Sequence, residues 1–328
     1  MSSAVWLFQL TFFFALMAKS AGWPSMAKII GNWFRPDEYG RVWGVLSTSS
    51  RVGTLASTFC LAALLVFMSW RWMLAISAAA GVVVVIAFTF VLRERPKIPL
   101  QANDGTETSR PPHSLDNTTL PEALLHFFTS IQFWLITGSL MGLTILWDFL
   151  LMVPLYLQDT LALTPTKASM AASAFPFGSL ISVLVGGYVF DKLSRGSTAW
   201  LMGFLLSVAT GCIATFLLMP TFGMSTAELT WLSMALLFVF GLCVSPCYYI
   251  PMSVFSIEFG GPHSGFLIAL LDALAFATNA VFYYFGGAIA QSSWNLFLTV
   301  LLIVSAWSML TTVVFMQGEA RRQHLKAR

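Results

Sequence analysis

The chain has 328 residues, of which 57% are hydrophobic and only 9% are charged, and its formal net charge is +3. Soluble domains carry roughly a quarter charged residues and just under half apolar residues, so a soluble fold of this composition would expose a large apolar surface to water. The composition indicates an all-α polytopic membrane protein and excludes disordered, collagen-like, disulfide-rich secreted and nucleic-acid-binding classes.

Apolar runs without helix breakers predict the membrane spans, because a helix that crosses a bilayer needs about 20 apolar residues. Between the third and fourth runs lies a polar stretch, residues 93–129, which is rich in Pro, Ser, Thr, Asn and charge and is interpreted as a solvated linker. Within it, residues 120–128 are expected to form a short surface helix. Nine runs qualify as spans: residues 5–29, 43–67, 72–92, 131–155, 167–190, 199–219, 230–252, 265–288 and 294–316.

The placement of the basic residues predicts the orientation in the membrane. If the linker is cytoplasmic, twelve basic residues fall on the cytoplasmic side and only Arg71 and Lys167 on the other. This bias obeys the positive-inside rule and predicts a cytoplasmic C-terminus and an N-terminus on the opposite side. The twelve are Arg35, Arg41, Arg93, Arg95, Lys97, Arg110, Lys192, Arg195, Arg321, Arg322, Lys326 and Arg328.

The sequence contains no motif typical of an enzyme. Its four cysteines fall inside apolar runs, and its four histidines fall in loops, at span edges or in the tail. We find no nucleophile–base pair, phosphate-binding loop or zinc signature. We therefore expect a protein that is not an enzyme and uses no cofactor or metal.

Two groups of three spans share a pattern. The first group has Trp23-Pro24 within a helix, then Gly40 after a loop, and Trp70 at the next turn, 30 residues on. The last three spans have Ser245-Pro246, Gly265 and then Trp294, 29 residues on. Parallel repeats of this kind build transporters from two six-helix halves. The nine spans then correspond to helices 4–12 of a twelve-helix fold, as though three spans were removed from the front.

Two stretches resemble a known family. Residues 22–53 read GWPSMAKIIGNWFRPDEYGRVWGVLSTSSRVG, and Trp70-Arg71 follows. Their GWP step, WF-P loop with Gly40, LSTS run and WR turn resemble the organophosphate:phosphate antiporters of the major facilitator superfamily, which include glucose-6-phosphate transporters. Residues 186–195, from Gly186 to Arg195, are similar to the superfamily's loop between helices eight and nine.

This resemblance implies a major facilitator fold that lacks the first three helices. Residues 1–92 would be the remnant of the N-terminal half, with three helices equivalent to helices 4–6. Residues 93–129 would be the cytoplasmic linker, residues 130–316 the C-terminal six-helix half, and residues 317–328 a basic cytoplasmic tail.

Four ionisable residues lie deep inside predicted spans: Lys19, Arg51, Asp148 and Asp272. Such residues are costly unless they are paired or hydrated, which makes them functional candidates. In the arrangement that the resemblance implies, the two basic residues face the two acidic ones across the halves. Either Lys19 and Arg51 bind an anionic substrate, or the four neutralise one another as ion pairs.

Polar and aromatic residues supply further candidates. Asn279 lies seven residues after Asp272, hence on the same helix face, and could hydrogen-bond the substrate or an opposing helix. Five aromatic residues fall on predicted pore-lining or flanking helices, where each is either a ligand contact or ordinary packing. They are Trp147, Tyr248, Tyr249, Tyr283 and Tyr284.

Other motif residues suggest conformational roles. Pro24 removes a helix hydrogen bond and kinks the first span, either for gating or only for packing. On the next span, Gly44, Ser47 and Arg51 share one face, where small residues permit close helix approach. A basic and acidic cluster at a cytoplasmic helix end forms either a conformational latch or simple topogenic charge; it comprises Asp191, Lys192 and Arg195.

The departures from the family limit what the resemblance implies. Its members use a basic residue on helix one, which this chain lacks, and often a second on helix seven, where residues 142–148 offer Asp148 instead. The favoured function is a secondary transporter of a small organic anion, with sugar phosphate exchanged for inorganic phosphate. One alternative is a proton-coupled carrier of another metabolite, with Asp148 or Asp272 as the proton site. Another is a truncated, transport-inactive fragment or a membrane sensor.

The expected partners are therefore a small anionic metabolite, with inorganic phosphate or protons, and the lipid bilayer, but no nucleic acid. The expected location is integral and multi-pass, in the inner membrane if the protein is bacterial.

Overall fold

The computed structural model describes residues 39–64, 67–91, 93 and 115–326, together with scattered residues between 6 and 34. Every regular element in these residues is a helix. The α-helices are α3 (Tyr39–Leu64), α4 (Trp70–Val91), α5 (Leu120–Thr129), α6 (Ile131–Leu161), α7 (Pro165–Ala172), α8 (Ala174–Lys192), α9 (Arg195–Leu218), α10 (Thr226–Gly260), α11 (Ser264–Ser292) and α12 (Trp294–Lys326). Two short 3-10 helices, η2 (Met219–Thr221) and η3 (Gly261–His263), follow α9 and α10.

The described residues contain seven segments that are long and apolar enough to cross a membrane. These findings confirm an all-helical membrane protein. The helix α3 has 26 residues but is not among the seven, since its Ser, Thr and Arg residues make it more polar. Most of the first predicted span, residues 5–29, lies outside the described residues, so the count of nine stays a prediction. The seven segments are Trp70–Val91, Ile131–Leu161, Pro165–Gly186, Gly196–Thr221, Thr226–Met252, Gly261–Ser292 and Trp294–Arg321.

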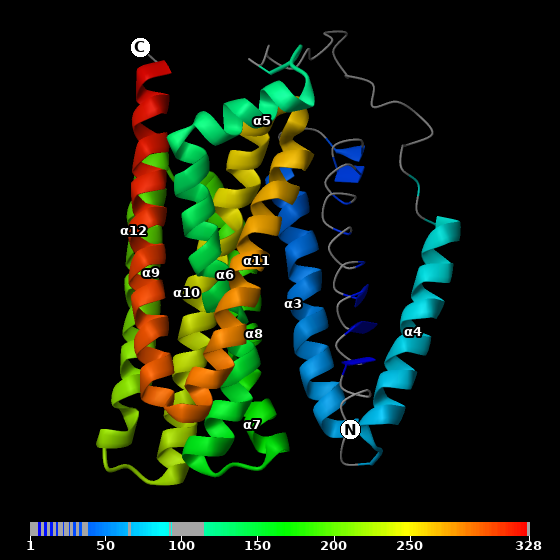
Figure 1. Cartoon of the computed structure of the whole chain (residues 1–328), viewed down its shortest axis with the longest axis vertical. Coiled ribbons are helices and arrows are strands. Elements are labelled where there is room, and N and C mark those ends of the chain that lie inside the picture. Colours follow the sequence, from blue (N-terminus) through cyan, green and yellow to red (C-terminus); the bar gives the residue numbers. More distant parts are fainter. Residues whose placement is uncertain are drawn as a thin grey trace.

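Six long helices form a bundle, and α3 runs alongside it (Figure 1). In the bundle, α8 packs against α10, and α12 packs against both α6 and α9, while α3 contacts α7 and α8. Figure 1 shows α4 set apart from the bundle, and none of its residues is buried. The helix α5 and the C-terminal end of α12 lie at one end of the bundle, and α7 lies at the other (Figure 1). The helix α5 and the C-terminal end of α12 thus share one end of the bundle, and the membrane side that this end faces stays a prediction.

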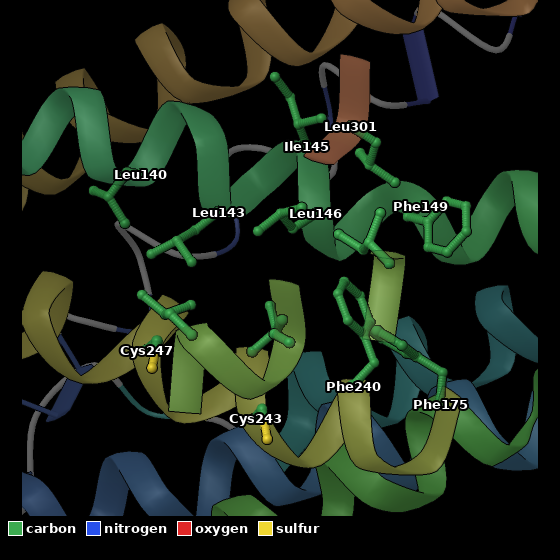
Figure 2. Packing of buried hydrophobic residues seen from close by; sticks show 14 of the residues in the cluster. Leu140, Leu143, Ile145, Leu146, Phe149, Phe175, Phe240, Cys243, Cys247 and Leu301 are labelled. Carbon is green, nitrogen blue, oxygen red and sulfur yellow. The ribbon is translucent and has the colours of Figure 1, made fainter. Parts of the chain in front are cut away.

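The apolar core is built mainly from α6, α9, α10 and α12. Figure 2 shows Leu143, Leu146 and Phe149 of α6 facing Phe240 of α10 and Phe175 of α8. Cys243 and Cys247 are buried in the same cluster, where they act as small apolar side chains. Because such interiors are close-packed, this cluster fixes the rotation of each helix and hence the direction of its polar side chains.

Close contact between α8 and α10 depends on two glycines. A Cβ atom on Gly178 would overlap the backbone carbonyl oxygen of Phe238, and one on Gly241 would overlap that of Phe175. Hydrogen bonds of 2.6 Å, from Ser245 Oγ to Ser179 Oγ and from Ser182 Oγ to the Leu242 carbonyl oxygen, join the same two helices.

The sequence pattern permits close helix approach along the face of α3 that carries Gly44, Ser47 and Arg51. Among the described residues, a Cβ atom on Gly44 would meet no atom within 4 Å. The close helix approach that the described residues show is the α8–α10 contact.

The predicted surface helix at residues 120–128 is confirmed as α5. A capping box begins it: the Glu122 carboxylate accepts a 2.7 Å hydrogen bond from the Thr119 backbone N–H. Ala123 and Phe127 are fully buried, and the His126 ring stacks on Phe259 of α10 with centroids 5.4 Å apart. One face of α5 is thereby attached to the end of the bundle.

We predict that α5 loosens under acidic conditions. The hydrogen bonds from Thr119 lower the pKa of Glu122, so the ionised carboxylate favours the capped helix. This contribution is present above the ordinary pKa of a glutamate and is lost as the pH falls through the lowered pKa of the folded state. Hydrogen exchange of the peptide covering α5, corrected for intrinsic rates, should show protection that falls on acidification, and Glu122→Ala should already lack it at neutral pH. Equal protection at all pH values in both proteins would contradict the prediction.

We predict that Gly178→Ala destabilises the bundle. The added methyl group must displace the α10 backbone, and overpacking of this kind costs about 1–3 kcal/mol. Thermal unfolding in detergent, followed by tryptophan fluorescence, should show a lowered midpoint. Gly211→Ala on α9 is the matched control, since a Cβ atom there meets no atom within 4 Å. Equal midpoints for the two variants would contradict the close contact.

Candidate functional site

The site begins with Arg51 on α3. This residue is only 6% exposed. Its Nη1 donates a 3.2 Å hydrogen bond to the carbonyl oxygen of Ser47, one turn earlier, while its Nε has no hydrogen-bond partner. Within the described part of the chain, Arg51 forms no ion pair with either Asp148 or Asp272. The guanidinium is therefore a buried cation whose donors are incompletely used.

Aromatic rings surround the Arg51 guanidinium. Its Cζ atom lies 4.9 Å from the ring centroid of Trp147 on α6 and 6.0 Å from that of Tyr249 on α10. Aromatic faces attract a cation by about 0.5–2 kcal/mol. This attraction is smaller than the cost of removing a guanidinium from water, so it holds the group in place without compensating its charge.

The ring of Trp147 is itself held by two other helices. It stacks on Tyr248 of α10, with centroids 5.9 Å apart and an angle of 16°, and meets Phe175 of α8 edge-on at 5.2 Å. The Tyr248 hydroxyl is within hydrogen-bonding reach of the Thr144 side chain on α6. We call Trp147, Tyr248 and Tyr249 the aromatic wall. Three helices fix its position.

Polar groups of α6 and α11 meet beside the aromatic wall. Asn279 Nδ2 donates a 2.5 Å hydrogen bond to Asp148 Oδ2. One turn later on α11, the Tyr283 hydroxyl donates a 2.7 Å hydrogen bond to the Ile145 carbonyl oxygen. Asn279 is 8% exposed, and its Oδ1 atom is buried without a hydrogen-bond partner. These two bonds lock α11 to the part of α6 that carries Trp147.

Asp272 completes the cluster. It is half-buried on α11, and it interacts electrostatically with Tyr248, as do Asp148 and Arg51. Tyr248 therefore lies close to all three charged candidates. Two polar atoms without a hydrogen-bond partner, Arg51 Nε on α3 and Asn279 Oδ1 on α11, belong to residues that contact neighbouring positions of α6, Trp147 and Asp148.

The structure describes some of the site residues that were predicted from the sequence, but not all of them. Arg51, Asp148, Asp272 and Asn279 come together as described. Lys19 and Pro24 lie outside the described residues. The roles of all these candidates in binding or gating stay predictions.

The latch cluster lies elsewhere in the fold. Asp191 and Lys192 end α8, Arg195 begins α9, and the Lys192 side chain is exposed. Its role as a conformational latch also stays a prediction.

Sequence reasoning overlooked part of the site. It did not single out Thr144 or Phe175, although Thr144 lies one turn before Asp148 on the same face and could have been found by that spacing. The aromatic candidates differ in their surroundings. Tyr248 and Tyr283 contact site residues, whereas the side chain of Tyr284 is 79% exposed. Among the described residues, no group of three or more His, Cys, Asp or Glu side chains is arranged to hold a metal ion.

The arrangement suits the binding of an anion between helices, and comparison with known proteins gives the family. The model of the Major Facilitator Superfamily matches residues 1–224. The chain belongs to this superfamily. The match covers about two thirds of the chain, including α3, α6 and the aromatic residue Trp147.

Several curated proteins are similar to this member of the superfamily. A probable L-galactonate transporter of Escherichia coli is 29% identical over 227 residues, 65% of this chain and 48% of that protein. The membrane sensor protein UhpC of Escherichia coli is 24% identical, over 64% of this chain and 50% of its own length. A putative glycerol-3-phosphate transporter of Arabidopsis thaliana is 21% identical, over 92% of this chain and 64% of its own. The chain thus spans about half to two thirds of the length of these relatives.

We predict that the bond between Tyr283 and Ile145 contributes to stability. Tyr283→Phe keeps the ring but leaves the carbonyl without this donor, which should cost about 1 kcal/mol. Thermal unfolding of the detergent-solubilised protein measures the loss. Tyr284→Phe is the control, because this neighbouring hydroxyl belongs to a residue that is 79% exposed. A larger loss in the control would contradict the assignment.

Proposed function

We propose that this protein is a secondary transporter that moves a small organic anion across a membrane by alternating access. The observation that carries the proposal is the Arg51 guanidinium, which is buried and forms no ion pair within the described chain. An ionisable group in that position is costly, and it marks a substrate pathway by default.

The chemistry of the guanidinium favours an anionic ligand. Its planar fork of donors matches the two oxygens of a carboxylate or of a phosphate group, and such bidentate contacts are among the stronger hydrogen bonds in proteins. Arg51 Nε is free to donate, and the aromatic wall keeps the guanidinium in one orientation. A bound anion would supply the missing counter-charge.

The location of Arg51 also supports transport. It lies on α3, which packs against α7 and α8 of the six-helix bundle. In the fold that the resemblance implies, α3 belongs to one half and the bundle to the other. Transporters of this type bind substrate at the interface between their repeats and expose it to alternate sides by rocking one half against the other. A ligand that contacts both halves is sensitive to that movement.

The names of the relatives narrow the substrate class. The names of the two transporters among them refer to L-galactonate and to glycerol 3-phosphate, both of which are small hydroxylated anions. We favour a sugar phosphate, exchanged for inorganic phosphate. Because the helix-seven stretch carries Asp148 where phosphate antiporters often have a base, a sugar acid is the second choice within the same class.

Two alternatives have specific support. A proton-coupled carrier is supported by Asp272, which is half-buried and for which no hydrogen bond is found among the described residues. A membrane sensor is supported by the similarity to UhpC. Membership of a superfamily with transporter relatives supports all these functions over an enzymatic one.

We predict that Arg51→Gln abolishes most transport of a sugar phosphate. Removing the charged partner of a buried ligand contact costs about 2–5 kcal/mol, or roughly 30-fold or more in affinity. The measurement is uptake of labelled glucose 6-phosphate, or of labelled galactonate, by proteoliposomes loaded with inorganic phosphate or with buffer. Arg71→Gln is the matched control: Arg71 also lies over a tryptophan, with Cζ 4.5 Å from the Trp70 centroid, but it is exposed.

The outcomes separate the three functions. Uptake that needs internal phosphate supports exchange, and uptake that follows an imposed proton gradient and is lost in Asp272→Asn supports proton coupling. Binding without uptake supports the sensor. If Arg51→Gln transports at the wild-type rate, the proposal that Arg51 binds the anion is wrong.

A further inference from the structure

A second buried group without a hydrogen-bond partner is the Oδ1 atom of Asn279. The side chain is 8% exposed, and this oxygen is buried without a hydrogen bond. An unsatisfied buried acceptor of this kind is uncommon in native proteins and calls for an explanation. Asn279 is linked to the Arg51 site through α6, because it bonds to Asp148, and the preceding residue, Trp147, contacts the Arg51 guanidinium with its ring.

Asp148 determines which way the Asn279 amide faces. An ionised carboxylate is only an acceptor, so it must bind the NH₂ group of the amide, as the 2.5 Å bond from Nδ2 to Asp148 Oδ2 shows. The amide oxygen then points to the opposite side. Rotating the amide would place two acceptors against each other, so Asp148 keeps Oδ1 available as an acceptor.

We propose that Asn279 Oδ1 accepts a hydrogen bond from a hydroxyl group of the substrate, and that Asp148 is the positioning residue that orients it. This inference rests on the proposed function and deepens it. Arg51 recognises the anionic end of the ligand, while Asn279 recognises a hydroxyl donor elsewhere on it. Together the two groups select a hydroxylated anion over an aliphatic anion of the same length.

The expected selectivity follows from the cost of an unpaired polar group. A ligand that lacks the hydroxyl leaves Oδ1 unsatisfied in the occupied site, whereas a hydroxylated ligand removes that penalty. The difference for one neutral hydrogen bond corresponds to about 5- to 150-fold in affinity. Inorganic phosphate reaches Arg51 but gains nothing from Asn279 unless it spans both groups.

The test compares two pairs of probes on the purified full chain. One pair is sn-glycerol 3-phosphate and propyl phosphate, and the other is galactonate and hexanoate. Dissociation constants from calorimetry in detergent should favour the hydroxylated member of at least one pair by 5-fold or more. In Asn279→Leu this preference should fall to about one, while the affinity for the member without hydroxyls stays within 2-fold of wild type.

Further variants separate recognition from a structural effect. Asp148→Asn should reduce the preference, because a neutral amide no longer dictates the orientation of Asn279. Thr278→Val is the matched control, since the hydrogen bond of the Thr278 hydroxyl among the described residues goes to the Leu274 carbonyl of its own helix, at 2.9 Å. It should keep the wild-type preference. Arg51→Gln should reduce the affinity for both members of a pair by the same factor.

Failure of this inference is distinguishable from failure of the proposed function. If wild-type protein binds both members of each pair equally, the inference about Asn279 is wrong and the transport of anions stands. If Asn279→Leu keeps the preference, the hydroxyl is recognised elsewhere and the inference is also wrong. If none of the four probes binds to the wild type, the proposed function fails, and this inference fails with it.

Discussion

A guanidinium group held away from water, whose contacts among the described residues are aromatic faces and one backbone carbonyl, is the constraint that organises this molecule. Cation–π contacts with Trp147 and Tyr249 and the bond to Ser47 are together weaker than the hydration that Arg51 gives up. Under the proposed function, a bound anion supplies the missing counter-charge. The proposal also accounts for an arginine at a position where an apolar residue would be more stable.

The rest of the structure keeps that site in shape. The close contact of α8 and α10 at Gly178 and Gly241 sets how Tyr248 meets Trp147, while the bonds from Asn279 and Tyr283 hold α11 against α6. The site residues therefore sit on helices fixed by packing rather than on loops. Among the described helices, the main contacts of α3 are with α7 and α8, so Arg51 is carried by a helix beside the bundle, whereas its aromatic partners lie within the bundle.

Much of the fold could be predicted because the hydropathy of a membrane span depends on consecutive residues and is therefore visible in the sequence. The long apolar runs predicted the helices, and the short helix expected at residues 120–128 of the polar linker is α5. The gathering of Arg51, Asp148, Asp272 and Asn279 followed from a simple rule, since charges deep in spans must face protein rather than lipid. The seven-residue spacing of Asp272 and Asn279 placed both on the inner face of one helix.

Contacts between helices could not be predicted, because they depend on rotation and vertical register that hydropathy leaves open. The bond from Asn279 to Asp148, the stacking of Trp147 on Tyr248 and the different environments of Tyr283 and Tyr284 all depend on that register. The same limit explains Gly44: a small residue permits a close approach but does not require one.

The most direct test of the central claim is an experimental structure of the full chain with a bound hydroxylated anion, such as glucose 6-phosphate or galactonate. The account predicts an anionic oxygen within hydrogen-bonding distance of Arg51 Nε, on the side of the guanidinium away from Ser47. A structure with the anion bound elsewhere, or with a carboxylate of the protein paired to Arg51 in the presence of ligand, would contradict it.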